Sequence, residues 1–400
     1  MSKNRARIAV LADWWWPETI GGAERSARDA ALELARSAEV AVFVPAAVET
    51  TYTDGPLTVY AVRRPFARRV HADSAARRGI EFLTAWLLPL VARRLTRRIA
   101  AFQPDVVVAG NVSRTGPWSV RWARSRGLPF VRIYHDLSDT CWRRSRLKGT
   151  RVCATICGSC QTKTSLMRWA TPPTATAVCV SDFVRRELTD AGLTTIDTSV
   201  VGYPLVGADA GTPVAVRPTN HDFVLGYIGR IAAVKGIESA IRVAAAYQRS
   251  TGKAVLMLVA GEGSAGYRQE LAALATAESI EVEFAGHMDV DAFCSRVDAA
   301  LIPSAWMEAF GRVAVEVGSR GRPMLISPLG GLPEAAAVSG GRYAFADFQD
   351  PAAAARALAE LLDSQPAARV EPVAAMTLSD GVAVAVRRAL VGGAHEGRTA

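Results

Sequence analysis

Two glutamates, Glu308 and Glu316, are eight positions apart around the start of an expected helix at 311–319. A carboxylate can accept hydrogen bonds from two hydroxyl groups at once, so one glutamate suits a sugar diol and the other a ribose diol. Gly311 would let backbone N–H groups approach a ligand closely, and the positive end of the helix would face a diphosphate. Two unrelated glutamates on an amphipathic helix are the alternative interpretation.

Arg230 and Lys235 follow an expected strand at 223–228. Ligands of parallel sheets bind at the carboxyl ends of the strands, and two cations there could neutralise a diphosphate leaving group. A solvated helix start is the alternative for these cations. Gly21 and Gly22, between the first strand and its helix, could likewise bring N–H groups to a phosphate, or could form a simple tight turn.

His135 and Asp136 follow the expected strand at 130–134, so they should lie at the same edge of their sheet. His135 could contact a ligand or could be a structural histidine, and Asp136 is expected to order the loop. Asp289 and Asp291 have the spacing of an Asp-x-Asp metal site. They come at a helix start, however, where aspartate is a favoured cap, and we interpret them as a cap.

Three consecutive tryptophans, Trp14, Trp15 and Trp16, stand before Pro17 in the loop after the first strand. Aromatic faces stack on sugar rings and on apolar aglycones, so Trp15 and Trp16 are candidates for the wall of an acceptor site. Packing of at least one of them in the core is an equally good interpretation.

Four of the six cysteines lie within twenty residues, and they are Cys141, Cys153, Cys157 and Cys160. Four thiolates in one loop could form a closed structural zinc site. Reduced thiols without a metal are the alternative, and no cofactor is expected to be needed for catalysis.

Strands alternate with helices along most of the chain. Buried strands are expected at 7–12, 39–45, 105–109, 130–134 and 176–180, and again at 223–228, 254–260, 280–285, 299–303 and 323–327, with helices between them. This alternation predicts doubly wound parallel sheets covered on both faces. The periodicity lapses over 202–220, which is the expected linker between two domains.

The formal net charge of +9 is unevenly divided, with +13 in the first 200 residues and −4 in the last 200. An expected helical stretch at 75–102 contains an apolar run, 80–92, that is followed by Arg93, Arg94, Arg97 and Arg98. Such a segment is too short to span a membrane but could dock on anionic lipid, although a solvated basic face is the default. No nucleic-acid-binding module is recognisable. The sequence predicts a cytoplasmic protein, with a peripheral position at the inner face of the membrane as an option.

Several of these motifs occur together in an order that resembles the large retaining glycosyltransferase family with the GT-B fold and an E-x7-E motif, the bacterial family 4-like enzymes. The matching segments are Gly21–Glu24, Pro104-Asp105, His135-Asp136, Gly229-Arg230, Lys235-Gly236, Glu308-x7-Glu316 and Gly330–Glu334.

The resemblance implies two Rossmann-like domains facing across a cleft, one at 1–206 with 379–400 crossing back onto it, and one at 207–378. It implies that Gly22, Arg230 and Lys235 bind the donor diphosphate. Glu308, Phe310 and Gly311 would contact the transferred sugar, Glu316 the ribose, and His135 would stabilise the transition state.

The implied reaction moves a hexose from a UDP- or GDP-linked donor to a glycan, lipid-linked or natural-product hydroxyl, with retention and without a metal. A sugar-nucleotide epimerase or phosphorylase of the same architecture is the alternative enzyme. A metal-stapled binding protein without catalysis is the alternative outside enzymes.

Overall fold

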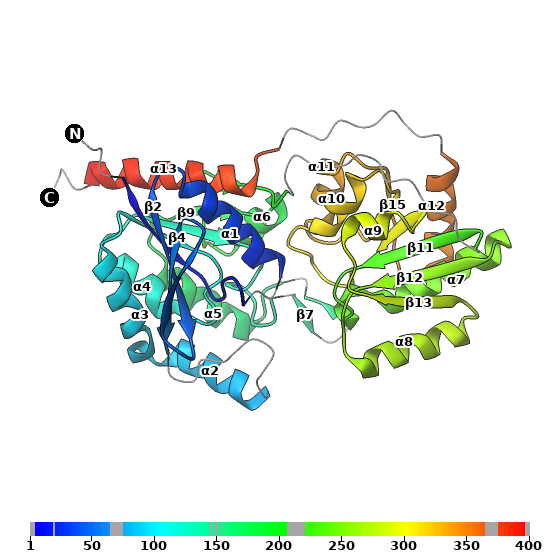
Figure 1. The fold of residues 1–400 in the computed structure, drawn as a ribbon, viewed down its shortest axis with the longest axis horizontal. Helices are drawn as coiled ribbons and strands as arrows, with labels where there is room; N and C mark the ends of the chain where they lie inside the picture. The colour runs from blue at the N-terminus through cyan, green and yellow to red at the C-terminus, as the bar shows by residue number, and fades with distance from the viewer. Residues whose placement is uncertain are drawn as a thin grey trace. The chain divides into compact units, whose positions relative to one another are not determined.

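The computed structural model describes residues 5–18, 21–64, 75–144, 146–148, 151–153, 155–205, 221–364 and 375–396. By its internal contacts the chain divides into two compact units, which are drawn in Figure 1. The first unit comprises the described parts of Met1–Arg146, Cys153–Pro204 and Met376–Ala400. The second comprises those of Leu147–Val152 and Leu205–Ala375. Residues 206–220, most of the expected linker, lie outside the described residues.

The first unit contains an eight-stranded sheet in the order β10-β9-β6-β5-β1-β2-β4-β3. All neighbours pair in parallel except β3 and β4. The strands are β1 (Arg7–Leu11), β2 (Glu39–Ala46), β3 (Thr50–Asp54), β4 (Leu57–Arg63), β5 (Val106–Ala109), β6 (Phe130–Tyr134), β9 (Thr176–Cys179) and β10 (Ser199–Val201).

Helices cover both faces of this sheet. The helices of this unit are α1 (Gly22–Leu34), α2 (Ala75–Leu87), α3 (Pro89–Phe102), α4 (Pro117–Ser125), α5 (Gly158–Ala170), α6 (Asp182–Asp190) and α13 (Leu378–Glu396). One continuous core joins β1, β2 and β5 to α2, α3, α4 and α5. On the other side α13, drawn in red in Figure 1, packs along α1 and against β9 and β6. The last helix of the chain therefore belongs to the first unit.

The second unit contains a six-stranded parallel sheet in the order β13-β12-β11-β14-β15-β16. Its core lies between β11, β12 and β14 and the helices α7 and α12. The strands are β11 (Phe223–Ile228), β12 (Val255–Ala260), β13 (Glu281–Gly286), β14 (Ala299–Ile302), β15 (Met324–Ile326) and β16 (Tyr343–Phe345). The helices are η1 (Ala233–Lys235), α7 (Ile237–Thr251), α8 (Ala265–Ala277), α9 (Val290–Cys294), α10 (Arg312–Gly318), α11 (Leu332–Val338) and α12 (Pro351–Asp363).

Several local features differ from those expected from the sequence. The helical stretch at 75–102 is two helices, because Pro89 lacks a backbone N–H and Leu88 before it is extended, with φ −112° and ψ 101°. The hairpin of β3 and β4 was not predicted. It turns at Gly55, whose φ of +60° is left-handed, and the edge strand β3 is mostly polar. The helix α5 and the short pair β7 (Leu147–Lys148) and β8 (Arg151–Val152) were also missed.

Candidate functional site

The Lys235 side chain meets Glu308 in the second unit. Lys235 ends η1, just after β11, and Glu308 lies in the loop between β14 and α10, so neighbouring strands bring both to one edge of the sheet. Nζ of Lys235 lies 2.5 Å from Oε1 of Glu308, and the hydroxyl of Ser304 donates to the same oxygen at 2.8 Å. Nζ also lies 5.2 Å from the centre of the Trp306 ring. The sequence analysis missed Ser304 and Trp306, although both are within four positions of Glu308.

The loop that carries Glu308 is fixed by the segment that begins at Gly330. A β-bridge joins Glu308 to Gly330, and the N–H of Gly331 donates to the carbonyl of Glu308 at 2.7 Å. Gly330 has a φ of +67°, and a Cβ there would lie 2.2 Å from the Glu308 carbonyl oxygen. Glycine is therefore required by the backbone conformation and by the close approach. Two motifs that are roughly twenty residues apart in the sequence form one loop pair.

Glu316 lies in α10, beyond Gly311, the N-cap residue of that helix. Gly311 has a φ of +100°, and a Cβ there would meet Leu332 at 2.4 Å. Glu316 is partly buried and pairs with Arg312 at 3.3 Å. Phe310 is only 3% exposed, so its ring belongs to the core. Glu316 thus places a second carboxylate on α10, the helix that follows the loop of Glu308.

Arg230 is exposed directly after β11, and its backbone carbonyl accepts a hydrogen bond from the Tyr227 hydroxyl at 2.8 Å. Burial raises the pKa of Tyr227; the nearby Glu308 carboxylate raises it further, and Arg230 opposes both. Tyr227 therefore stands within electrostatic reach of both Arg230 and Glu308. The four residues Arg230, Lys235, Glu308 and Tyr227 form a polar group at the end of β11.

His135 lies in the first unit, directly after β6. Its Nε2 is buried, with no hydrogen-bond partner within the described part of the chain. Burial lowers the pKa of His135 to about 4, with Asp136 opposing the shift and Arg132 adding to it. The ring is therefore neutral near pH 7. Asp136 accepts the N–H of Ser138 at 2.8 Å, which is the loop-ordering contact expected of it.

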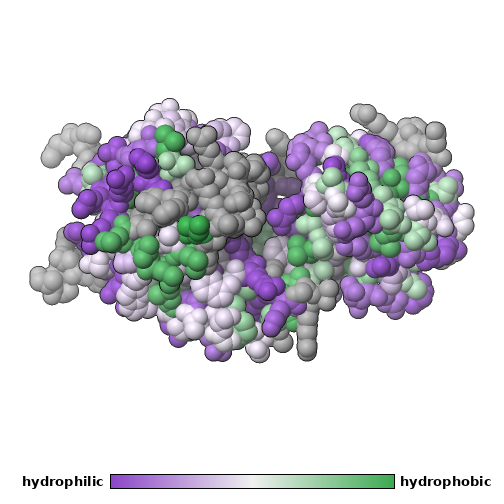
Figure 2. Space-filling model, turned by 90° about the horizontal axis from the view of Figure 1, so that it is seen from below, coloured by the Kyte–Doolittle hydropathy of each residue, from purple (hydrophilic) through white to green (hydrophobic). Residues whose placement is uncertain are grey.

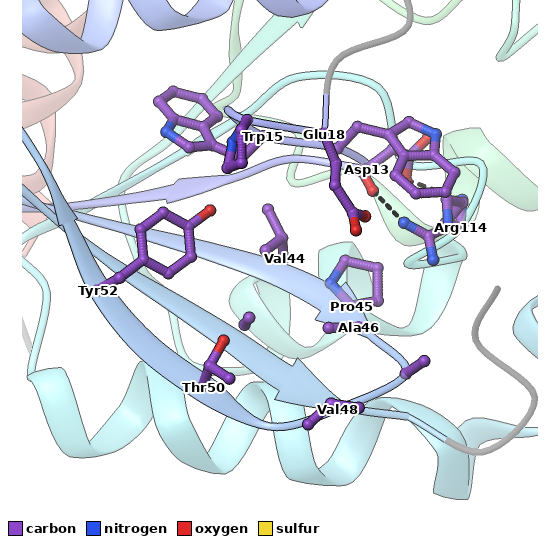
Figure 3. Close-up of a pocket in the computed structure, with 14 residues that line it drawn as sticks. Asp13, Trp15, Glu18, Val44, Pro45, Ala46, Val48, Thr50, Tyr52 and Arg114 are labelled. Atoms are coloured by element: carbon purple, nitrogen blue, oxygen red, sulfur yellow. Dashed lines mark hydrogen bonds between the residues drawn. The ribbon is translucent and has the colours of Figure 1, made fainter. Parts of the chain in front are cut away.

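A cavity of about 350 Å³ opens beside the tryptophans in the first unit (Figure 3). Trp14, Trp15 and Glu18 line it from the loop after β1, and Val44–Val48 and Tyr52 line it from β2 and β3. Trp16 is not among its lining residues and is 52% exposed, whereas Trp15 is only 3% exposed. The sequence analysis selected Trp15 and Trp16; the cavity is lined by Trp14 and Trp15.

The walls of this cavity are held by hydrogen bonds of the buried charged residues Asp13 and Arg114. The Asp13 carboxylate accepts the N–H groups of Ser113 and Arg114, both at 2.8 Å. The Arg114 guanidinium donates to the Asp13 carbonyl at 2.6 Å, the dashed line in Figure 3, and lies 3.5 Å from the centre of the Trp14 ring. The sequence analysis did not single out Asp13 or Arg114, and the position of Asp13 directly after β1 was the available signal.

A second set of contacts fixes the hairpin side of the cavity. The Trp15 indole donates to Asp54 at 3.1 Å, and Arg28 pairs with the same carboxylate through two bonds of 2.7 Å and 2.6 Å. The Tyr52 hydroxyl donates to the carbonyl of Trp16 at 2.6 Å. Figure 3 shows the Glu18 carboxylate turned toward the space between Pro45 and Arg114. The cavity thus combines mainly apolar walls with the carboxylates of Asp13 and Glu18 and the guanidinium of Arg114.

The remaining predicted site residues have simpler surroundings. Gly22 is the first residue of α1, and Gly21 before it is extended. Asp289 caps α9 by accepting the N–H of Ala292 at 2.8 Å, as expected, and Asp291 pairs with Arg320 at 2.5 Å.

The four cysteines differ in exposure: Cys141 and Cys160 are buried, Cys153 is intermediate and Cys157 is exposed. Within the described ranges, no group of three or more His, Cys, Asp or Glu side chains is arranged to hold a metal ion.

The helices α2 and α3 present large apolar side chains to solvent. Their exposed fractions are 46% for Ile80, 55% for Leu83, 66% for Leu87, 48% for Leu88 and 60% for Leu90. Figure 2 shows hydrophobic side chains gathered on the underside of the first unit, where α2 lies in Figure 1. The basic residues of α3 follow in the sequence, and they are Arg93, Arg94, Arg97 and Arg98. Of the helices described here, none is long and apolar enough to span a bilayer.

Comparisons with known sequences match both halves of the chain. Residues 20–202 match the family model described as Glycosyltransferase Family 4, and residues 214–373 match the model described as Glycosyl transferases group 1. The glycogen synthase of Mycobacterium tuberculosis is 34% identical over 162 residues, 39% of this chain and 37% of that protein. The D-inositol 3-phosphate glycosyltransferase of Corynebacterium diphtheriae is 30% identical over 164 residues, 39% and 38% of the two chains. These matches span well under half of each relative.

Solved structures of low sequence identity share the fold over nearly the whole chain. Anabaena Alr3699/HepE in complex with UDP and glucose has a TM-score of 0.59 at 17% identity and covers 98% of both chains. WaaG, a glycosyltransferase involved in lipopolysaccharide biosynthesis, has a TM-score of 0.62 at 15% identity over 96% of this chain and 95% of that chain. Two Rossmann-like units, the paired motif loops and both family models lead to one conclusion: the chain belongs to the GT-B glycosyltransferases of the group 1 and family 4 type.

Proposed function

We propose that the protein is a retaining, metal-independent glycosyltransferase that moves a hexose from a nucleotide diphosphate sugar to an acceptor hydroxyl. The observation that carries this proposal is the Lys235–Glu308 contact of 2.5 Å, since it joins a phosphate-binding cation to a hydroxyl-binding carboxylate. Several relatives act on sugars by name, and HepE was crystallised with UDP and glucose, which supports a nucleotide-sugar donor.

In the proposed mechanism Arg230 and Lys235 bind the diphosphate and neutralise the charge that develops as the sugar–phosphate bond breaks. The Glu308 carboxylate then accepts hydrogen bonds from hydroxyls of the transferred sugar, and Glu316 accepts those of the ribose. The backbone of Phe310 and Gly311 lies beside the sugar, and Gly22 brings an N–H group to the phosphate side.

The same mechanism needs no protein nucleophile. The departing phosphate oxygen takes the proton of the acceptor hydroxyl, which attacks from the same face and gives retention. His135 is neutral near pH 7, because burial lowers its pKa to about 4, so it contributes a hydrogen bond to the transition state rather than a charge.

The cavity beside Trp14 and Trp15 is the proposed acceptor pocket. The Trp15 indole and the Tyr52 hydroxyl are held by hydrogen bonds within the protein, which leaves mainly apolar surface for a ligand. A volume of about 350 Å³ is within the range of small-molecule sites. Glu18 supplies an acceptor for a hydroxyl or ammonium group. An acceptor with a flat apolar body and a polar edge fits this pocket.

The exposed face of α2 and α3 is the proposed contact with an anionic membrane. Leu83 and Leu87 are one helical turn apart on α2, Leu90 lies at the start of α3, and each of the three is more than half exposed. The arginines 93, 94, 97 and 98 follow on α3, so apolar insertion and attraction to anionic headgroups act on neighbouring parts of one surface. A membrane-carried acceptor would reach the enzyme there.

The membrane contact is tested by sedimentation with vesicles of phosphatidylglycerol and phosphatidylcholine. We expect binding that weakens with salt and falls at least about tenfold in a Leu83→Glu, Leu87→Glu variant. Equal binding by that variant would contradict the proposal. The control is Ala272→Glu, at an exposed position of α8 in the second unit. Leu274 on the same helix is not used, because it packs against the core.

The activity itself is tested by release of free nucleotide from UDP- and GDP-sugars. A thermal-shift series with these donors first identifies the ligand, because a ligand that binds only the folded state raises the melting temperature. Release should require an acceptor and persist in EDTA, and the product should keep the anomeric configuration of the donor. Stabilisation by no nucleotide sugar would contradict the proposal.

A further inference from the structure

Two cysteines stand at the beginning of α5 in the first unit. Cys157 is the N-cap residue, with an extended backbone at φ −71° and ψ 161°, and the helix starts at Gly158. The N–H of Cys160 donates to the carbonyl of Cys157 at 2.8 Å, so the two residues are joined across one turn. Residues three apart at a helix start lie on the same side, which is close enough for a disulfide without moving the backbone far.

The two thiols differ in exposure and in proton affinity. Cys157 is exposed, and its Sγ lies 3.5 Å from the hydroxyl of Ser159. The Ser159 hydrogen bond, together with the Cys160 N–H and thiol, lowers the pKa of Cys157 to about 7. Cys160 is 8% exposed, and burial raises its pKa to about 11. One thiol is therefore accessible to a reagent in solution, and its neighbour is protected.

The surroundings favour a pair rather than a four-cysteine metal site. Cys141 is buried, Cys153 is only partly so, and the described residues contain no group of three or more His, Cys, Asp or Glu placed to hold a metal. Lys163, one turn further along α5, donates to the Cys141 carbonyl at 3.3 Å and lies over the rings of Trp86 and Trp142. The buried side of α5 thus carries Cys160 and Lys163, with the indoles of Trp86 and Trp142 against Lys163, and Cys157 is exposed at the beginning of the helix.

We propose that Cys157 and Cys160 form a redox-active dithiol, with Cys157 as the attacking thiol and Cys160 as the resolving thiol. The oxidant is a hydroperoxide. The Cys157 thiolate attacks its terminal oxygen, breaking the O–O bond to give a sulfenic acid and, after protonation, an alcohol or water. The Cys160 sulfur then attacks the Cys157 sulfur, forming the disulfide and releasing water. Two thiols and one hydrogen peroxide thus give one disulfide and two waters. This inference does not depend on the proposed transferase activity.

The test uses the reduced full-length chain with hydrogen peroxide, followed by alkylation and mass spectrometry of the peptide that contains both cysteines. We expect a loss of two hydrogens in that peptide, reversed by a dithiol reductant. At pH 7 and without peroxide, iodoacetamide should modify Cys157 at least about tenfold faster than Cys160. Buried Cys294, in the second unit, is the internal control for an unreactive thiol.

Two variants separate the roles of the two thiols. Cys160→Ala should accumulate a sulfenic acid at Cys157 that a dimedone probe captures, because no resolving thiol remains. Cys157→Ser should give neither disulfide nor sulfenic acid, and serine at an N-cap keeps the helix start. The proposal is overturned if the wild type forms no Cys157–Cys160 disulfide, or if Cys160→Ala captures no dimedone. It is also overturned if the purified protein holds stoichiometric zinc that protects both thiols until a chelator removes it.

Discussion

Lys235 and Glu308 are 73 residues apart in the sequence, yet their side chains make an ion pair of 2.5 Å. Both are partly buried, with side-chain exposures of 23% and 12%, so the contact lies neither in the core nor in bulk water. In the absence of donor the carboxylate holds the ammonium group in place. A diphosphate and a sugar hydroxyl could then exchange for this contact without a large rearrangement.

We expect Lys235→Ala and Glu308→Gln each to lower kcat/KM for the donor by about 10²–10³, the usual effect of removing one group that stabilises developing charge. Because the two groups contact each other, the losses should not be additive in free energy, and the double variant should be less impaired than the sum. The rate of nucleotide release is measured for the two single variants and for the double variant. Lys253→Ala, an exposed lysine of the same unit, is the control. Single variants with wild-type rates would contradict the assignment.

Gly330 allows a second prediction, which concerns stability. Gly330 and Gly252 have nearly equal φ values, +67° and +68°, but a Cβ at Gly252 meets nothing within 4 Å. Gly252→Ala should therefore cost about 1–2 kcal/mol for the left-handed conformation alone. Gly330→Ala should cost roughly 1–3 kcal/mol more, because its Cβ would overlap the Glu308 carbonyl and force the loops apart. Chemical denaturation of the two variants compares them, and equal costs would show that the close approach is unimportant.

The sequence could predict that Arg230, Lys235 and Glu308 lie together because each follows a buried strand. The expected strands at 223–228 and 299–303 are β11 (Phe223–Ile228) and β14 (Ala299–Ile302), which are neighbours in one parallel sheet, so their carboxyl ends lie at one edge. Thus Arg230, Lys235 and Glu308 could be grouped from the sequence alone. Their partners Ser304 and Trp306 could not, since a loop's course is set by tertiary contacts such as the bridge to Gly330.

The cavity proposed as the acceptor pocket was only half predictable. The tryptophans were noticed for their chemistry, but which indole lines the cavity depends on Asp54 and Arg28, and Asp54 ends a hairpin strand that was missed. The polar strand β3 has no hydrophobic alternation of its own, because it is an edge strand supported by β4. Likewise α5 was missed because the four cysteines from Cys141 to Cys160 were assigned to one loop, with or without a metal, whereas Cys160 lies on a helix that Cys157 caps. Local sequence patterns therefore predict the sheets, whereas long-range contacts determine which residues line the pocket.

The pocket itself allows a third prediction. Ala47 lines the cavity near the turn between β2 and β3, and Ala47→Trp should fill much of its volume of about 350 Å³. We expect the KM for acceptor to rise at least about tenfold while the thermal shift produced by the donor is unchanged, because the proposed donor-binding residues Arg230, Lys235 and Glu308 lie in the other unit. Ala272→Trp, on an exposed position of α8, is the control for adding an indole. Unchanged acceptor kinetics would place the acceptor elsewhere.

His135 allows a prediction about pH. Its pKa is lowered to about 4 in the folded protein, mainly by burial, while an unfolded histidine titrates near 6.5. Between these values the unfolded chain binds the proton and the folded chain does not, so stability is complete above about pH 6.5 and is lost as the pH falls toward 4. Across that range the free energy of unfolding should fall by about 1.4 kcal/mol for each pH unit.

The measurement is the melting temperature of the wild type and of His135→Asn between about pH 4 and pH 8. Asparagine does not titrate here, so the wild type should lose stability relative to the variant below about pH 6.5 and show a constant difference above it. His287→Asn, altered at an exposed position of the second unit, measures the effect of replacing a histidine as such. Parallel curves for wild type and His135→Asn over the whole range would mean that the ring protonates as easily in the folded protein as in the unfolded chain. A neutral His135 could then no longer be assumed in the proposed transition state.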